Sequence, residues 1–176
     1  MPATESDSAA QEILAAWRTG DTDRLVAGLR DPEHRGVAAR LLGREGRTEA
    51  IPKIELLLSA ADFEARLGAV RALAMLQSVD SFDRILELAR SDPHHNVRLW
   101  SIAAVGEIGG PGAQEFLVPL LSASDWDTRR AAAFALGKLG DSSAIEPLQA
   151  AGKTERLHRR GVYRRAIRAI RSAGTP

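Results

Sequence analysis

Five arginines recur along this 176-residue chain at an almost constant spacing, and this spacing constrains the fold more than any other feature of the sequence. We call them the marker arginines. The intervals are 31, 32, 31 and 31 residues, between Arg35, Arg66, Arg98, Arg129 and Arg160. A constant period of this length is typical of an array in which one supersecondary unit is copied and stacked on its neighbours.

Apolar residues follow each marker arginine at helical spacing. Pairs such as Ala38 and Ala39, or Ala132 and Ala133, stand three and four residues later. The residues seven later are Leu42, Leu73, Val105, Leu136 and Ile167. Offsets of 3, 4 and 7 trace one face of an α-helix. A shorter apolar pattern precedes each such helix, and Asp, Ser and Pro residues separate the two as helix caps.

The repeat therefore predicts five two-helix units and no strand. Their bounds are about 20–46, 47–77, 78–110, 111–140 and 141–172. A further helix, about 8–18, carries Ile13, Leu14 and Trp17 on one face and is expected to cap the first unit. We predict a single domain over residues 8–172, a disordered tail at 1–7 and a second tail at 173–176.

Asp125 to Gly140 shows the repeat most clearly, as D-x-x-x-R-x-x-A-A-x-A-L-G-x-L-G. This pattern resembles HEAT repeats of the short, bilin-lyase-like type, and the resemblance extends over about residues 20–172. It implies an all-α, right-handed α-solenoid whose arginine-led helices line a concave groove. It also implies that Asp31, Asp62, Asp92 and Asp125 form a ladder of ion pairs with the marker arginines, a role that Arg160 lacks an acidic partner to fill.

If the arginine-led helices line the groove, the residues one, two and five positions after each marker arginine face into it. The prominent ones are Arg40, Arg71, Trp100, Arg130, Phe134 and Arg165. Guanidinium groups beside exposed rings favour an acidic protein or peptide as the partner. The alternative is that the rings are half-buried packing residues and the arginines a solvated face.

Charge is distributed unevenly along the chain, although the formal net charge is only +1. Residues 1–34 carry a net −4 and residues 153–176 a net +7. Five arginines of the basic segment follow each other at steps of four or three and are expected to share one helical face: Arg156, Arg160, Arg164, Arg168 and Arg171. This face could bind nucleic acid, an acidic protein or an anionic membrane. Alternatively it is a solvated terminal cap, because Arg164 replaces the apolar residues Ile102 and Ala133 of earlier units.

Several classes of site are not expected. The chain has no cysteine, and its four histidines, His34, His94, His95 and His158, are too scattered to form a metal site. We predict no metal and no cofactor. No apolar stretch is long enough to span a bilayer, and no signal peptide opens the sequence, so a cytoplasmic location is expected.

Three classes of enzyme use HEAT-like arrays. The iron-dependent deoxyhypusine hydroxylases carry His-Glu pairs, which this chain lacks. HEAT-like DNA glycosylases hold nucleic acid in a basic groove with a carboxylate, for which Trp100 and Glu107 are the candidates, although Glu107 is expected one turn beyond the groove. In a bilin lyase, arginines could hold the propionates of a tetrapyrrole that stacks on Trp100. The sequence favours a non-catalytic adaptor that binds an acidic protein or peptide, with a bilin-lyase-like subunit and a nucleic-acid-binding module as alternatives.

Overall fold

The structure is a computed structural model that describes residues 5–173. Within this range every regular element is an α-helix or a short 3-10 helix, and none is a strand. The chain falls into two compact units, unit 1 (Met1–Arg84) and unit 2 (Ile85–Pro176), which are described separately. The predicted all-α solenoid class is confirmed. The single domain over 8–172 stays a prediction.

Unit 1 contains a capping helix and two repeats. Its helices are α1 (Glu5–Thr19), α2 (Thr22–Gly28), α3 (Arg35–Arg44), α4 (Ile51–Leu56) and α5 (Phe63–Met75). Short 3-10 helices, Thr48–Ala50, Leu57–Ser59 and Val79–Ser81, flank α4 and follow α5. Helix α2 packs on α3 and α4 on α5, as the two-helix units predict, and α1 packs on α2.

The first helix differs from its prediction in two respects. It begins at Glu5, so residues 5–7 of the predicted tail are helical, whereas residues 1–4 and 174–176 of the two tails lie outside the described residues. Its buried side chains are Ile13 and Ala16, while Leu14 is 40% exposed. The prediction that Leu14 belongs to the apolar face of this helix was therefore wrong, whereas Ile13 is buried as predicted.

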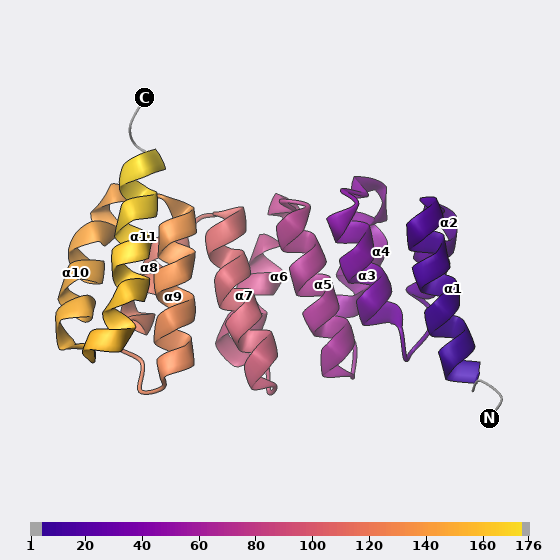
Figure 1. Ribbon diagram of the computed structural model, residues 1–176, viewed down its shortest axis with the longest axis horizontal. Helices are drawn as coiled ribbons and strands as arrows, with labels where there is room; N and C mark the ends of the chain where they lie inside the picture. Colours follow the sequence, from indigo (N-terminus) through magenta and orange to yellow (C-terminus); the bar gives the residue numbers. More distant parts are fainter. Residues whose placement is uncertain (1–4, 174–176) are drawn as a thin grey trace. The chain divides into compact units, whose positions relative to one another are not determined.

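Unit 2 contains most of the third repeat and the last two repeats. Helix α6 (Phe82–Ser91) contains the boundary between the units, and α7 (His95–Ile108), α8 (Ala113–Leu120), α9 (Trp126–Leu139), α10 (Ile145–Thr154) and α11 (Arg160–Ala173) follow. Short 3-10 helices, Ser142–Ala144 and Leu157–Arg159, precede α10 and α11. The arginine-led helices α7, α9 and α11 lie side by side, with α8 and α10 packed against them (Figure 1).

Local sequence signals set the ends of the long helices. The Asp62 and Asp125 carboxylates accept from the backbone N–H groups of Ala65 and Thr128, and so cap the N-termini of α5 and α9. Three long helices end before a glycine with positive φ, namely Gly46, Gly109 and Gly140. The predicted register is confirmed by Leu42, Leu73, Val105 and Leu136, all 0% exposed, whereas Ile167 in α11 is only half-buried.

Consecutive long helices within a unit approach each other almost backbone to backbone. A β-carbon on Gly43 would lie 2.5 Å from the Ala72 Cα, one on Gly106 2.4 Å from the Ala135 Cα, and one on Gly137 2.9 Å from the Ala166 Cα. In each pair the glycine is eight residues after one marker arginine and the alanine six after the next. The repeat therefore stacks through a glycine-on-alanine contact that has no room for a larger side chain.

The marker arginines have a structural role. Four of them donate to backbone carbonyls of the turn before their own helix: Arg66 to Ala60 and Ala61, Arg98 to Asp92 and Pro93, Arg129 to Ala123 and Ser124, and Arg160 to Lys153 and Glu155. Most of these carbonyls lie in the turn just after the preceding helix, and the carbonyl of Lys153 belongs to the last turn of α10. Each guanidinium therefore joins the two helices of its repeat.

One pair of the predicted ladder is present inside the units, and a second marker arginine forms an ion pair with an acid outside that ladder. Arg35 pairs with Asp62 of the following repeat, as expected. Arg129 pairs with Glu155, an acid that sequence analysis assigned to no pair. Asp31 instead pairs with His34 in its own turn, at 2.7 Å.

The close stacking gives a direct stability test at Gly106. In an ordinary helix interior, glycine-to-alanine substitution stabilises by about 1 kcal/mol. We expect Gly106→Ala to destabilise unit 2 instead, by about 1–3 kcal/mol in chemical denaturation, because its methyl group would overlap the backbone of Ala135. The matched control is Gly161→Ala in α11, where a β-carbon would meet nothing within 4 Å and no loss is expected. Equal effects of the two substitutions would contradict the close stacking.

Candidate functional site

A groove of about 670 Å³ lies in unit 2 across the three arginine-led helices. Helix α7 contributes Asn96, Leu99, Trp100, Ala103 and Glu107; α9 contributes Arg130, Ala131, Phe134, Gly137 and Lys138; α11 contributes Val162, Arg165, Ala166 and Ala169. Most of these residues stand one, two, five or nine positions after a marker arginine. The groove therefore follows one repeated face of the three helices, and the glycine-on-alanine contact of Gly137 with Ala166 lies within its lining.

Two aromatic side chains stand partly in solvent within this groove. Trp100 is 44% and Phe134 45% exposed. They come from neighbouring helices, at positions two and five after their marker arginines. Large rings left half-exposed beside apolar Leu99 and Val162 give the groove an apolar centre, which is a common property of interface anchors.

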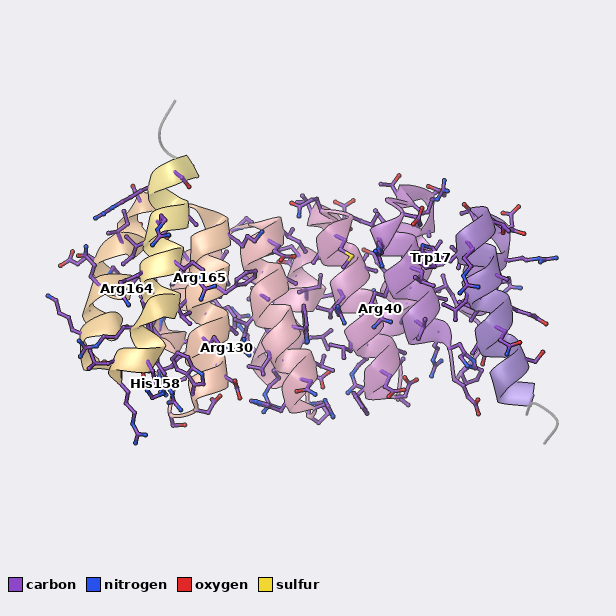
Figure 2. The ribbon with its side chains drawn as sticks, in the orientation of Figure 1. Trp17, Arg40, Arg130, His158, Arg164 and Arg165 are labelled. Atoms are coloured by element: carbon purple, nitrogen blue, oxygen red, sulfur yellow. The ribbon has the colours of Figure 1, made fainter. Side chains whose placement is uncertain are left out.

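Three cationic side chains line the groove together with the rings: Arg130, Lys138 and Arg165. Arg130 and Arg165 project from α9 and α11, the two neighbouring helices on which Figure 2 labels them. The Lys138 ammonium lies 5.7 Å from the centre of the Phe134 ring. A guanidinium nitrogen of Arg130 lies 3.4 Å from a carboxylate oxygen of Asp127, which is a long distance for an ion pair. Both side chains are more than half exposed. Glu107 is the single acid among the groove-lining residues, so these side chains carry a net charge of +2.

Unit 1 has a smaller hollow of about 220 Å³ between α3 and α5. Arg40 and Arg71 line it together with the acids Glu33, Asp62 and Glu64. Burial, and then the positive charge of Arg40, lowers the pKa of Arg71 from its usual value. The two guanidinium groups are therefore close enough to repel each other, although the acids make the hollow as a whole mixed in charge.

The six predicted groove residues thus separate by unit. Trp100, Arg130, Phe134 and Arg165 share the groove of unit 2, and Arg40 and Arg71 share the hollow of unit 1. One continuous surface of all six stays a prediction. Lys138 and Glu107 also line the groove, although Lys138 was not among the predicted residues and Glu107 was expected one turn beyond them. Helical spacing could have identified both residues. Each stands nine positions after a marker arginine, which is four residues beyond position five and on the same helical face.

A buried cluster holds α11 in position beside α9. The Glu155 carboxylate accepts from the Arg129 guanidinium and lies 3.4 Å from the Tyr163 hydroxyl, which is itself buried. The Trp126 ring packs against Tyr163 and lies 4.7 Å from the Arg159 guanidinium carbon. Because Tyr163 is two residues before Arg165, this cluster fixes the helix that presents Arg165 to the groove.

The predicted basic C-terminal face is smaller than expected. Arg164, Arg168 and Arg171 are exposed on α11, but Arg156 precedes the helix and lies outside it. Arg160 is half-buried because its guanidinium donates to the carbonyls of Glu155 at 2.8 Å and Lys153 at 3.0 Å. The prediction that all five arginines share one helical face was therefore wrong for Arg156. Arg160 lies on the helix, but its guanidinium is turned toward carbonyls of its own turn. A partner-binding role of this face stays a prediction.

Residues 5–173 contain neither a metal-binding cluster nor a membrane-spanning helix. In this part of the chain, no three His, Asp or Glu side chains gather closely enough to hold a metal ion. None of the described helices combines the length and the apolar character needed to cross a bilayer.

Comparison with known proteins identifies the family. Residues 22–106 and 82–171 match the HEAT-repeat family, so the chain is a HEAT-repeat protein. It is 28% identical to a protein called uncharacterized phycocyanin operon protein Z, from Pseudanabaena tenuis, over 137 residues that cover 73% of this chain and 68% of that protein.

Two solved structures illustrate the likeness of fold. The complex of CpcE and CpcF of phycocyanin lyase from Nostoc is similar with a TM-score of 0.57 and 19% identity, over 99% of this chain and 90% of the matched chain. An engineered protein matches with a TM-score of 0.64 and 22% identity, over 92% and 84%. The predicted resemblance to HEAT repeats of the bilin-lyase-like type is confirmed.

The buried cluster predicts a pH dependence of stability. Burial raises the pKa of Glu155, but the hydrogen bond and charge of Arg129 outweigh burial, and the net pKa lies below its usual value. A lowered pKa in the folded state stabilises the fold above the unfolded-state pKa, and this stabilisation is lost as pH falls through the folded-state value. We expect Glu155→Gln to cost about 1–3 kcal/mol near pH 7. The difference from wild type should shrink below about pH 4.

Urea denaturation of both proteins between pH 3 and pH 7 measures this difference. Glu115→Gln, at an exposed residue of α8, is the control and should cost little at any pH. A cost of Glu155→Gln that stays constant over this range would contradict the ion-pair assignment.

Proposed function

We propose that this HEAT-repeat protein is a non-catalytic adaptor, and that the groove of unit 2 binds an acidic segment of a partner protein. The observation that carries the proposal is the combination of two half-exposed rings with three cations in one groove. An apolar side chain of the partner would pack between Trp100 and Phe134, while carboxylates on either side would pair with Arg130 and Arg165.

Chemistry favours a carboxylate-bearing partner over a neutral one. Guanidinium groups form two parallel hydrogen bonds to a carboxylate, and Arg130 and Arg165 reach the groove from neighbouring helices. Glu107 at the α7 side would repel an anion there, so the acidic part of the segment is expected over α9 and α11. The rings then supply the apolar contact that usually dominates the binding energy.

Charge reversal in the groove should abolish partner binding while the fold is retained. The variant is Arg130→Glu with Arg165→Glu, and the measurement is recovery of bound proteins from source lysate by mass spectrometry. We expect the main partner to be lost, with a drop of about tenfold or more in affinity once it is purified. Binding to wild type should weaken as salt rises, because exposed charges are screened.

The matched control reverses two exposed arginines of unit 1, Arg18→Glu with Arg30→Glu, and should bind the partner as wild type does. All three proteins should have nearly the same melting temperature, because exposed substitutions rarely change stability by more than about 0.5 kcal/mol. A partner that binds the groove variant normally would refute the assignment of the groove.

A bilin-lyase-like role is the second candidate, because the relatives bear phycocyanin operon and phycocyanin lyase names. The groove offers what a tetrapyrrole would need: a ring surface at Trp100 and cations for two propionates at Arg130 and Arg165. On this reading the acidic partner of the groove is the pigment, and the protein acts as a lyase or lyase subunit.

Absorbance separates the two candidates. Phycocyanobilin is added to the purified protein, and the visible spectrum is compared for wild type, Trp100→Ala and the control with Arg18 and Arg30 reversed. A saturable spectral change that Trp100→Ala removes and the control keeps would favour the pigment reading. An unchanged spectrum for wild type leaves the protein-binding proposal as the function of the groove.

A further inference from the structure

The side of α11 opposite the groove carries a second row of arginines. Arg164, Arg168 and Arg171 are exposed and stand four, eight and eleven residues after the marker Arg160. We call them the outward row. Figure 2 shows Arg164 on the side of α11 away from Arg165 and Arg130. The outward row is therefore separate from the cations that line the groove.

The same three positions have a different role in the other repeats of unit 2. They are Ile102 and Gly106 in α7 with Gly109 directly after it, and Ala133 and Gly137 in α9 with Gly140 directly after it. There the first residue is buried, the second meets an alanine of the next long helix, and the third lies near that helix's end. The outward row thus occupies the stacking face of the repeat, with arginines in place of small or apolar residues.

From this placement we infer that the outward row binds an acidic α-helix of a partner protein, which packs on α11 as one more layer of the array. Arginine at these positions prevents the close glycine-on-alanine stacking. A partner helix would instead lie further from α11, at the reach of the guanidinium groups. Carboxylates at steps of four and three residues on that helix would match the spacing of the row.

The charges of the outward row all have the same sign, which is not needed in a terminal helix whose charges serve only solubility. Arg164 and Arg168 are four residues apart, a spacing at which like charges destabilise a helix, and α11 contains no Asp or Glu. Helix α1, which covers the first repeat of unit 1, carries charges of both signs, including Glu12 and Arg18. Such a mixture of positive and negative charges is sufficient for solubility. A row of one sign favours a ligand of the opposite sign.

Protein carboxylates fit this surface better than nucleic acid does. Proteins that bind single strands combine cations with exposed rings on which bases stack. The aromatic residue of α11, Tyr163, is 1% exposed and faces the cluster around Glu155. The outward row therefore offers charge and hydrogen bonds in helical register but no stacking surface.

The probe is a synthetic, fluorescently labelled helical peptide with glutamates at steps of four and three residues along one face. Anisotropy should show saturable binding to wild-type protein. We expect Arg164→Glu with Arg168→Glu to weaken it about tenfold or more, because two attractive charges become repulsive. The control Arg18→Glu with Arg30→Glu, which changes the net charge equally, should stay within about twofold of wild type.

Three outcomes would overturn the inference. They are no saturable binding by wild type, an equal loss in the control, and tighter binding of a single-stranded oligonucleotide of equal charge through the same two arginines. The groove is tested separately: Arg130→Glu should leave the peptide bound. Conversely, reversal of Arg164 and Arg168 should leave the groove partner bound, so the two proposals can fail independently.

Discussion

The contact of a glycine in one long helix with an alanine in the next determines how the repeats of each unit stack. Gly43 on Ala72, Gly106 on Ala135 and Gly137 on Ala166 bring backbones so close that even a methyl group would not fit. A glycine inside a helix costs about 1 kcal/mol relative to alanine. Its recurrence at an equivalent position indicates that close packing of the backbones more than offsets this cost.

The close stacking also creates the candidate site. When two helices touch along small residues, longer side chains on either side of the line of contact project in the same direction. In unit 2 this places Trp100, Phe134 and Arg165 from three helices around one groove. The chemistry of the groove therefore depends on residues that do not form the stack, and can vary from one HEAT-repeat protein to another without change of fold.

Helix α11 presents arginines with three different roles. Arg160 donates to carbonyls of its own turn and stabilises the last repeat. Arg165 lines the groove, and Arg164 points to the opposite side. The arginines of residues 153–176 thus do not form one surface. Some make structural contacts, one lines the groove, and others form the outward row.

The sequence by itself determined the period, the helical register and the ends of the helices. Leu42, Leu73, Val105 and Leu136 are buried as their spacing predicts, because periodicity along one helix reports directly which face is apolar. Only the tertiary structure decided which side chains from different helices meet. It placed Glu107 and Lys138 in the groove, paired Glu155 with Arg129, and turned Arg160 onto carbonyls. These outcomes depend on the distance and rotation between helices, which the residue pattern of a single helix does not contain.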